Sequence, residues 1–356
     1  MSDKTDSGRT RFPFISSDAF VSPTDRVALT NLQKTPLLPL LVRKFNEYAV
    51  DKIFYVKNSA ESVRCGPNQF PTLFHMMQEA ASILNVPEPE LYVKYDYSYN
   101  AYTAGVNRTF ITLHSALVDN FTNDELMFII GHEMGHIKCG HVLYQMMGRM
   151  LIPLLEVIGD VTLGVGKLAG VGLVMGFYEW MRQAEFSCDR AGLLVSQNVR
   201  DSFSATMKLG CGSTRLNEEM NLDAFLEQAR SHSEQAGLEG LAKGLLFLMY
   251  TWQLDHPQVV FRAKGLDEWI KSSAYETILG GQYAQDMTGG FQMGGQRRCK
   301  GCSTMVSATV RFCPNCGSDL NSAAPVTPPP AAACAKCGAA LARGAKFCAD
   351  CGASVQ

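Results

Sequence analysis

Residues 122–141 read TNDELMFIIGHEMGHIKCGH, and the rest of the fold is organised around this stretch. Thr122 followed three residues later by Glu125 is the pattern of a capping box, which opens a helix. Five apolar residues then continue the helix into the motif His-Glu-Met-Gly-His. Because an α-helix turns about 100° per residue, His132 and His136 lie about 40° apart and direct two imidazoles to one point.

Two imidazoles on one helix face can hold a metal ion. A catalytic zinc takes a third ligand from the protein and leaves its fourth position to water. In the segment QAEFSCDRAG, Glu185 is the candidate for the third ligand. Glu133 can reach the water without being a ligand, so it is the candidate general base. Asp189, one helical turn after Glu185, can accept the second ring N–H of a ligand histidine and fix its tautomer.

The competing interpretation is that the two histidines are merely buried in an apolar helix. It would place two imidazoles and a carboxylate in the core with no metal to compensate them, which is costly. His141 is about 180° from His132 if the same helix continues, so it is not counted as a ligand. Arg182 and Arg262 either pair with carboxylates near the site or are surface charges.

A second metal-binding pattern lies in the last sixty residues. Four C-x-x-C pairs form two units, with ten residues between the two pairs of each unit. This spacing predicts two zinc ribbons, each holding one zinc with four thiolates. Disulfides are the alternative, but a C-x-x-C pair bends too tightly for an easy bridge, and the N-terminus lacks a secretory signal. The predicted ligands are Cys299, Cys302, Cys313 and Cys316 in the first unit, and Cys334, Cys337, Cys348 and Cys351 in the second.

Charge disfavours nucleic acid as the partner of these ribbons. The chain carries a net charge of −2, whereas residues 297–356 carry seven Lys and Arg against two Asp. Each zinc held by four thiolates contributes about −2, so two of them bring this region close to neutral. A protein partner or a purely structural role is therefore preferred for the ribbons.

Together these motifs resemble the peptidase family 48 gluzincins, which include the HtpX heat-shock proteases and the CAAX prenyl proteases. The resemblance covers about residues 70–275. It rests on Asn100-Ala101-Tyr102-Thr103-Ala104-Gly105, the strand-like residues 110–114, Asp124-Glu125-Leu126, HEMGHIKCGH, Glu185-x-x-x-Asp189-x-x-Gly192, and His256-Pro257 with Arg262.

The resemblance implies roles for single residues. It implies that His132, His136 and Glu185 hold zinc and that Glu133 is the base. It also implies that the segment Asn100-Ala101-Tyr102 is an edge strand on which a peptide substrate lies by β-augmentation. In the family, a downstream His-Pro often directs an imidazole toward the scissile carbonyl, and His256 would take that role. The alternative for His256-Pro257 is a simple helix start with proline in the first turn.

The expected fold is α+β and mainly helical: a zincin-like metallopeptidase domain with a small antiparallel sheet, followed by two zinc ribbons. Strands are expected at 91–95, around residue 100 and at 110–114. Helices are expected at 73–84, 201–209, 222–230, 238–252 and 259–269. The predicted domains are a flexible N-terminus (1–35), the metallopeptidase domain (36–285), a glycine-rich linker (286–296), ribbon 1 (297–320), a Pro/Ala-rich linker (321–333) and ribbon 2 (334–356).

Residues 161–177 form the most apolar stretch. They fall short of the roughly 20 residues that a span needs and contain Lys167, so a buried core helix or hairpin is preferred over a membrane-touching loop. Cys65, Cys139, Cys188 and Cys211 have no partner spacing, so they are predicted to be reduced, buried and without chemistry.

The sequence therefore predicts a cytoplasmic, zinc-dependent endopeptidase with one catalytic and two structural zinc ions. Its expected substrates are peptides or unfolded proteins. Peripheral membrane association is the less favoured alternative for its location. The rival function is a non-catalytic scaffold that binds protein or nucleic acid through its ribbons.

Overall fold

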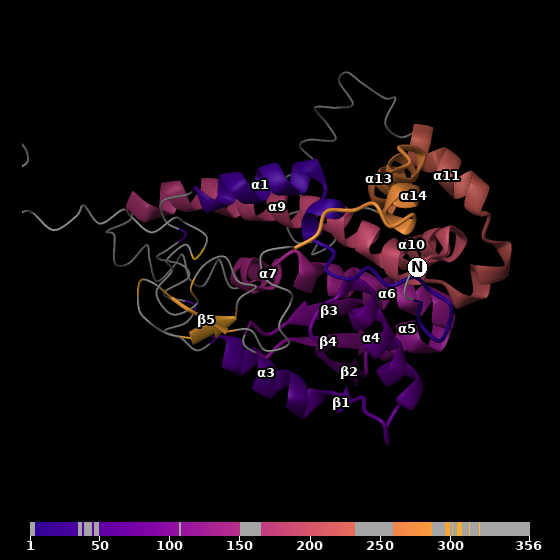
Figure 1. The fold of residues 1–356 in the computed structure, drawn as a ribbon, viewed down its shortest axis with the longest axis horizontal. Helices are drawn as coiled ribbons and strands as arrows, with labels where there is room; N and C mark the ends of the chain where they lie inside the picture. Colours follow the sequence, from indigo (N-terminus) through magenta and orange to yellow (C-terminus); the bar gives the residue numbers. More distant parts are fainter. Residues whose placement is uncertain are drawn as a thin grey trace, which may run out of the picture.

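The protein is described here by a computed structural model. It describes residues 4–34, 38, 45, 50–106, 108–149, 165–231, 259–286, 296–299, 301, 305–307, 313 and 320. Figure 1 shows a small sheet on one side of two central helices, α6 and α9, and a group of shorter helices at one end of α9. The mainly helical α+β fold predicted from the sequence is confirmed.

The sheet has four strands in the order β1-β2-β4-β3. It is mixed, not antiparallel as predicted, because β2 and β4 run parallel while β1 and β3 pair antiparallel at the two edges. After β2 the chain passes to the far edge, forms β3 and turns back into β4, which places β4 alongside β2 in the same direction. The strands are β1 (Val63–Arg64), β2 (Glu90–Lys94), β3 (Ala101–Ala104) and β4 (Phe110–His114).

Helix α6 (Asn123–Lys138) carries the His-Glu-Met-Gly-His motif and begins as predicted. The Glu125 N–H donates to Thr122 Oγ1 at 3.2 Å, and the Thr122 N–H donates to Glu125 Oε2 at 2.8 Å. The helix ends earlier than expected, because Gly140 adopts a φ of +72° that favours glycine and turns the chain. His141 is therefore not on α6, and its predicted position opposite His132 is wrong.

Helix α9 (Val165–Ser196) packs across α6 at close range. A Cβ added at Gly135 would lie 2.8 Å from the Cβ of Ala191. A Cβ added at Gly192 would lie 2.8 Å from the carbonyl oxygen of Phe128. Because glycine at these positions lets the two backbones approach, the acidic residues of α9 come within reach of the α6 histidines.

The N-terminal segment belongs to the folded body. The side chains of Phe12, Ile15 and Phe20 are at most 1% exposed. Helix α1 (Pro23–Gln33) follows and lies along α9. The flexible N-terminus predicted for residues 1–35 is therefore wrong for residues 4–34, because their apolar side chains complete the core.

The remaining helices support this frame, and the predicted helices at 73–84, 201–209, 222–230 and 259–269 are confirmed. The predicted helix at 238–252 lies outside the described residues. These helices are η1 (Ser17–Ala19), α3 (Val50–Glu61), α4 (Pro71–Leu84), α5 (Ser115–Asn120), α7 (Val142–Arg149), α10 (Val199–Cys211), η2 (Thr214–Glu219), α11 (Leu222–Ser231), α13 (Val259–Lys271) and α14 (Ala274–Leu279).

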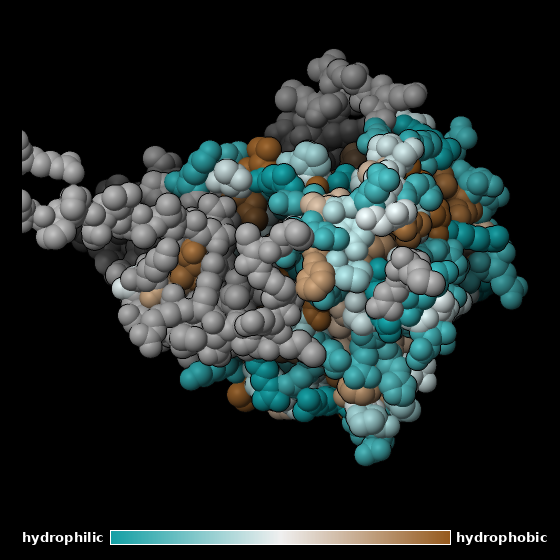
Figure 2. Space-filling view, viewed as in Figure 1, coloured by the Kyte–Doolittle hydropathy of each residue, from teal (hydrophilic) through white to brown (hydrophobic). Residues whose placement is uncertain are grey.

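The apolar stretch at 161–177 falls largely within α9, whose described part begins at residue 165. In the part of the chain that the structure describes, no helix combines the length and apolar character needed to cross a membrane. Figure 2 shows that hydrophilic side chains predominate on one face of the molecule, with apolar groups interspersed among them.

Only fragments of the first predicted ribbon are described. Strands β5 (Gln296–Arg298) and β6 (Met305–Ser307) pair antiparallel. Cys299 and Cys313 are buried, and the Gly301 N–H donates to Cys299 Sγ at 3.3 Å. The other six ribbon cysteines and the 321–333 linker lie outside the described residues, and only the two ends of the 286–296 linker are described.

Candidate metal centre and active site

Two imidazoles from α6 and one carboxylate from α9 meet in the protein interior. His132 Nε2 lies 3.2 Å from Glu185 Oε2, and His136 Nε2 lies 3.4 Å from Glu185 Oε1. The three residues are at most 3% exposed. Tetrahedral zinc with bonds of about 2.0–2.1 Å needs ligand atoms about 3.3 Å apart. Two imidazole nitrogens and a carboxylate at this spacing therefore fit a zinc ion.

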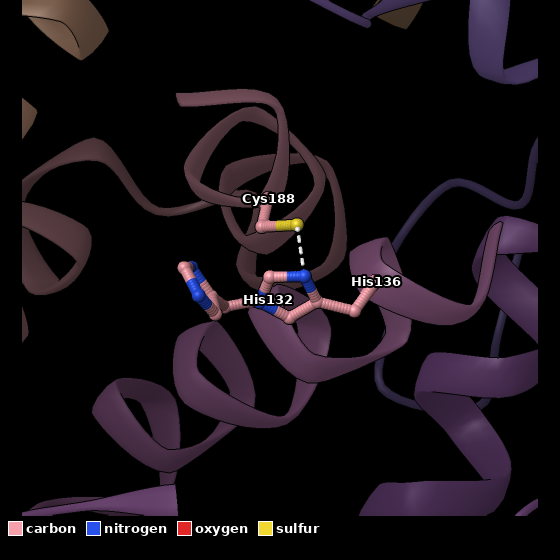
Figure 3. Close-up of side chains that lie close together, drawn as sticks. All are labelled: His132, His136 and Cys188. Atoms are coloured by element: carbon pink, nitrogen blue, oxygen red, sulfur yellow. Dashed lines mark hydrogen bonds between the residues drawn. The ribbon is translucent and has the colours of Figure 1, made fainter. Parts of the chain in front are cut away.

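Cys188 also lies close to the two histidines, as Figure 3 shows. One ligand atom of each of these three residues lies within 4.8 Å of the others. However, Cys188 Sγ contacts Nδ1 of His136, at 3.2 Å, whereas Glu185 faces Nε2 of both rings. Burial raises the pKa of the Cys188 thiol, which disfavours the thiolate that binds metal. We therefore favour Glu185 over Cys188 as the third ligand.

The second nitrogen of His132 is held by a buried ion pair. Its Nδ1 lies 2.9 Å from Asp189 Oδ1. Arg262 Nε donates to Asp189 Oδ2 at 2.9 Å, and Arg262 Nη2 donates to Oδ1 at 2.5 Å. Although burial alone would raise it, the charge of Arg262 holds the pKa of Asp189 below its usual range. Asp189 therefore stays ionised and accepts from the Nδ1–H, which leaves Nε2 of His132 to face Glu185.

Without metal, this site attracts a proton. Burial disfavours a charged imidazole, but the carboxylate of Glu185, assisted by Asp189, raises the pKa of His132 to about 9. A metal ion at Nε2 must therefore displace a proton. Of the two arginines that the sequence left undecided, Arg262 pairs with Asp189, whereas Arg182 pairs with the exposed Glu179 on its own helix.

Glu133 is next to His132 on α6 and contacts the sheet. The hydroxyl of Thr103, on strand β3, donates to Glu133 Oε2 at 2.6 Å. The two residues are only 1% and 2% exposed. The sequence pattern assigns Thr103 no role of its own at the site. Strand alternation carries a signal, since it places Thr103 on the same face as Ala101, toward α6.

A separate polar cluster surrounds the second nitrogen of His136. His136 Nδ1 lies 3.2 Å from His141 Nδ1 and 3.0 Å from Gln145 Nε2. His141 Nε2 in turn lies 3.2 Å from Asp25 Oδ2, a carboxylate of helix α1. His141, which is not counted as a ligand on the assumption that the same helix continues, thus lies beside the second nitrogen of His136. Nothing in the sequence pattern points to Asp25.

Among the strands of the described residues, β3 pairs only with β4, so the predicted substrate strand is at an edge of the sheet. The carbonyl of Asn100 accepts from the His114 N–H at 3.0 Å, and Ala101 and Tyr102 begin β3. His256 lies outside the described residues, so its role stays a prediction.

The four cysteines outside the ribbons only partly match the prediction. Cys65 and Cys188 are buried, as expected. Cys139 is half-buried and Cys211 is exposed, which corrects the prediction of burial. Cys211 is exposed because it is the last residue of α10, at the surface.

Comparisons with known proteins identify similar families and proteins. The model of peptidase family M48 matches residues 67–270, and that of the double zinc ribbon matches residues 299–352. The plastoglobule-localized metallopeptidase 48 of Arabidopsis thaliana chloroplasts is 34% identical over 271 residues, which cover 75% of this chain and 77% of that protein.

Other similarities are weaker. A protease HtpX homolog of Caldanaerobacter subterraneus is 28% identical over 182 residues, 43% of this chain and 61% of that protein. The crystal structure of Ste24p from S. mikatae aligns with a TM-score of 0.32 and 16% identity, over 72% of this chain and 68% of that one.

Proposed function

This chain belongs to peptidase family M48, and we propose that it is a zinc-dependent endopeptidase that hydrolyses peptide bonds in peptides or unfolded proteins. One observation supports this most strongly. Two imidazole nitrogens and the Glu185 carboxylate surround one buried point, and a further carboxylate, Glu133, stands beside them on α6. The proposed zinc ligands are His132, His136 and Glu185.

Each buried group has a chemical task in this proposal. A bound zinc ion supplies a Lewis acid that polarises a carbonyl oxygen and acidifies water. Glu133 takes a proton from the attacking water and delivers it to the leaving amine. The Thr103 hydroxyl holds Oε2 of Glu133, so the other carboxylate oxygen remains to receive the proton. Asp189 and Arg262 fix the ring of His132.

The substrate is proposed to pair with the outer edge of β3. Asn100 forms a hydrogen-bonded pair with His114 of β4, and hydrogen bonding alternates along an antiparallel pair. The backbone groups of Ala101 and Thr103 therefore point away from β4, toward the edge where a peptide would add as a strand. Thr103 is only 1% exposed, so a substrate can reach this edge only once it is uncovered.

The role of the ribbons and the cellular location are also proposals. We propose that the ribbons hold one structural zinc each and bind a protein partner, since the double zinc ribbon model matches there and the predicted charge is near neutral. The cytoplasmic location rests on the sequence alone.

The proposed activity is tested by Glu133→Gln in the full chain. Digestion of casein, with and without a chelator, is compared between wild type and the variant. Glu179→Gln is the matched control, because it removes an exposed glutamate from α9 without touching the site. Wild type and control should cleave casein only without chelator. The Glu133 variant should retain its zinc and lose about 10²–10⁴-fold in rate. Cleavage by the variant at the wild-type rate, or cleavage that resists the chelator, would overturn the proposal.

A further inference from the structure

The two histidines of the proposed zinc site differ in what holds their second nitrogen. A histidine that binds metal through Nε2 carries its proton on Nδ1, and that N–H needs an acceptor that orients the ring. For His132 the acceptor is the carboxylate of Asp189. For His136 the nearby atoms among the described residues are His141 Nδ1, Gln145 Nε2 and Cys188 Sγ, at 3.2, 3.0 and 3.2 Å.

Only one of these three atoms is a good acceptor as it stands. The amide nitrogen of Gln145 is a donor. The sulfur of Cys188 is only a weak acceptor. The Nδ1 of His141 accepts if the proton of that ring is on Nε2. The hydrogen-bond partner of Nε2 therefore decides whether His141 can serve His136.

That partner is Asp25. Its Oδ2 lies 3.2 Å from His141 Nε2, and both side chains are at most 1% exposed. The carboxylate is itself held, because Trp180 Nε1 donates to Oδ1 at 3.1 Å and Ser187 Oγ donates to Oδ2 at 2.5 Å. A carboxylate can only accept here, so it fixes the proton of His141 on Nε2 and leaves the lone pair of Nδ1 facing His136.

We propose that Asp25 and His141 are positioning residues for the zinc ligand His136, acting as a carboxylate–imidazole pair that accepts the Nδ1–H of His136 and directs its Nε2 to the metal. The inference rests on the proposed zinc site. It makes helix α1, which the sequence predicts to be a flexible N-terminus, a part of the metal centre. Loss of such an orienting partner typically lowers metal affinity 10- to 100-fold.

The test measures zinc retention by the full chain during titration with a chelator. Glu185→Ala should lose the active-site zinc and keep the zinc of the ribbons, whose cysteine ligands are unchanged. The difference from wild type identifies the zinc equivalent that belongs to the active site. Asp25→Ala and His141→Phe remove the two proposed groups. Asp25→Asn keeps an oxygen that can accept from His141. Ser202→Ala is the matched control, since it removes a buried hydroxyl of α10 that bonds to Ser196 and Asn198, away from the site. Melting temperature is recorded for every variant.

The expected result separates orientation from general stability. Asp25→Ala and His141→Phe should release the active-site zinc at a chelator concentration 10- to 100-fold lower than wild type. Asp25→Asn should release it at a concentration close to that of wild type. Ser202→Ala should change the melting temperature but shift zinc release less than about 3-fold, so that affinity does not simply follow stability. An effect of Gln145→Met equal to that of His141→Phe would overturn the assignment of the acceptor.

The failure of this inference differs from that of the proposed function. If Glu185→Ala loses no zinc equivalent, the proposed zinc site itself is wrong and the inference falls with it. If Glu185→Ala loses one equivalent while Asp25→Ala and His141→Phe release theirs at the wild-type chelator concentration, the zinc site stands and the positioning role is refuted. If either variant fails to fold, Asp25→Asn still tests the proposal. This variant should keep its zinc because the amide oxygen can accept from His141. If it binds zinc weakly while its melting temperature is unchanged, the positioning role is refuted.

Discussion

Replacing Thr103 with valine tests whether strand β3 controls the general base. Valine keeps the shape and the β-branched character that suit a strand, and it removes only the hydroxyl. That hydroxyl donates to Glu133 Oε2 at 2.6 Å, in a site where both residues are almost fully buried. The variant therefore leaves the zinc ligands in place and frees one oxygen of the base.

The magnitude follows from the charge of the acceptor. A hydrogen bond to a charged group contributes about 1.5–3 kcal/mol. If this energy orients Glu133 for proton transfer, its loss appears in the barrier, where about 1.4 kcal/mol is a factor of ten in rate. We expect kcat of Thr103→Val to fall about 10- to 150-fold. Thr103→Ser keeps the hydroxyl and should stay within about 3-fold of wild type.

The assay is steady-state cleavage of a quenched fluorescent peptide, with zinc content and melting temperature measured on the same preparations. Equal zinc content in all three proteins shows that the change acts on the base and not on the metal. A Thr103→Val enzyme with the kcat of wild type would refute the role of the hydroxyl. An equal loss in Thr103→Ser would attribute the effect to packing.

Three further perturbations probe the frame around the site. Arg262→Met leaves the buried carboxylate of Asp189 without its arginine partner and should lower the free energy of unfolding by about 3–5 kcal/mol in urea titrations; an unchanged urea midpoint contradicts this. Gly135→Ala places a methyl group against Ala191 and should cost about 1–3 kcal/mol in the same measurement. Asp25→Asn tests pH dependence: burial alone would raise the pKa of Asp25, but its pairing with His141 holds it below the unfolded value. The carboxylate therefore stabilises the fold fully above about pH 4 and loses this contribution as the pH falls through the folded pKa. The urea midpoints of wild type and variant should converge in acid, and a gap that stays constant would refute the assignment.

The parts of the site that sequence can predict are those set by local geometry. The spacing of His132 and His136 and the capping box at Thr122 are features of one helix, and periodicity alone places them. Glu185 could be named as a candidate from its segment, but it comes from another helix, so no periodicity within α6 places it beside the histidines. The close contact that brings α9 to α6 depends on small residues such as Gly135, whose meaning appears only when the facing residue is known.

The parts that escaped prediction are contacts between segments far apart in the chain. The parallel pairing of β2 with β4 depends on where β3 goes first, which no short-range pattern encodes. The bond from Thr103 to Glu133 and the contact of Asp25 with His141 join a strand or the N-terminal helix to the centre. The early end of α6 could have been predicted from the local sequence. Gly140 directly follows the last residues of the helix, and a glycine just after a helix commonly ends it.

The central claim is that His132 Nε2, His136 Nε2 and a carboxylate oxygen of Glu185 hold one zinc ion. A crystal of the full chain, measured at the zinc absorption edge, tests this most directly through an anomalous difference map. We predict a peak about 2.0–2.2 Å from each of these three atoms. A peak bonded instead to Cys188 Sγ and Nδ1 of His136, or no peak beside α6 in a chain whose ribbons contain zinc, would contradict it.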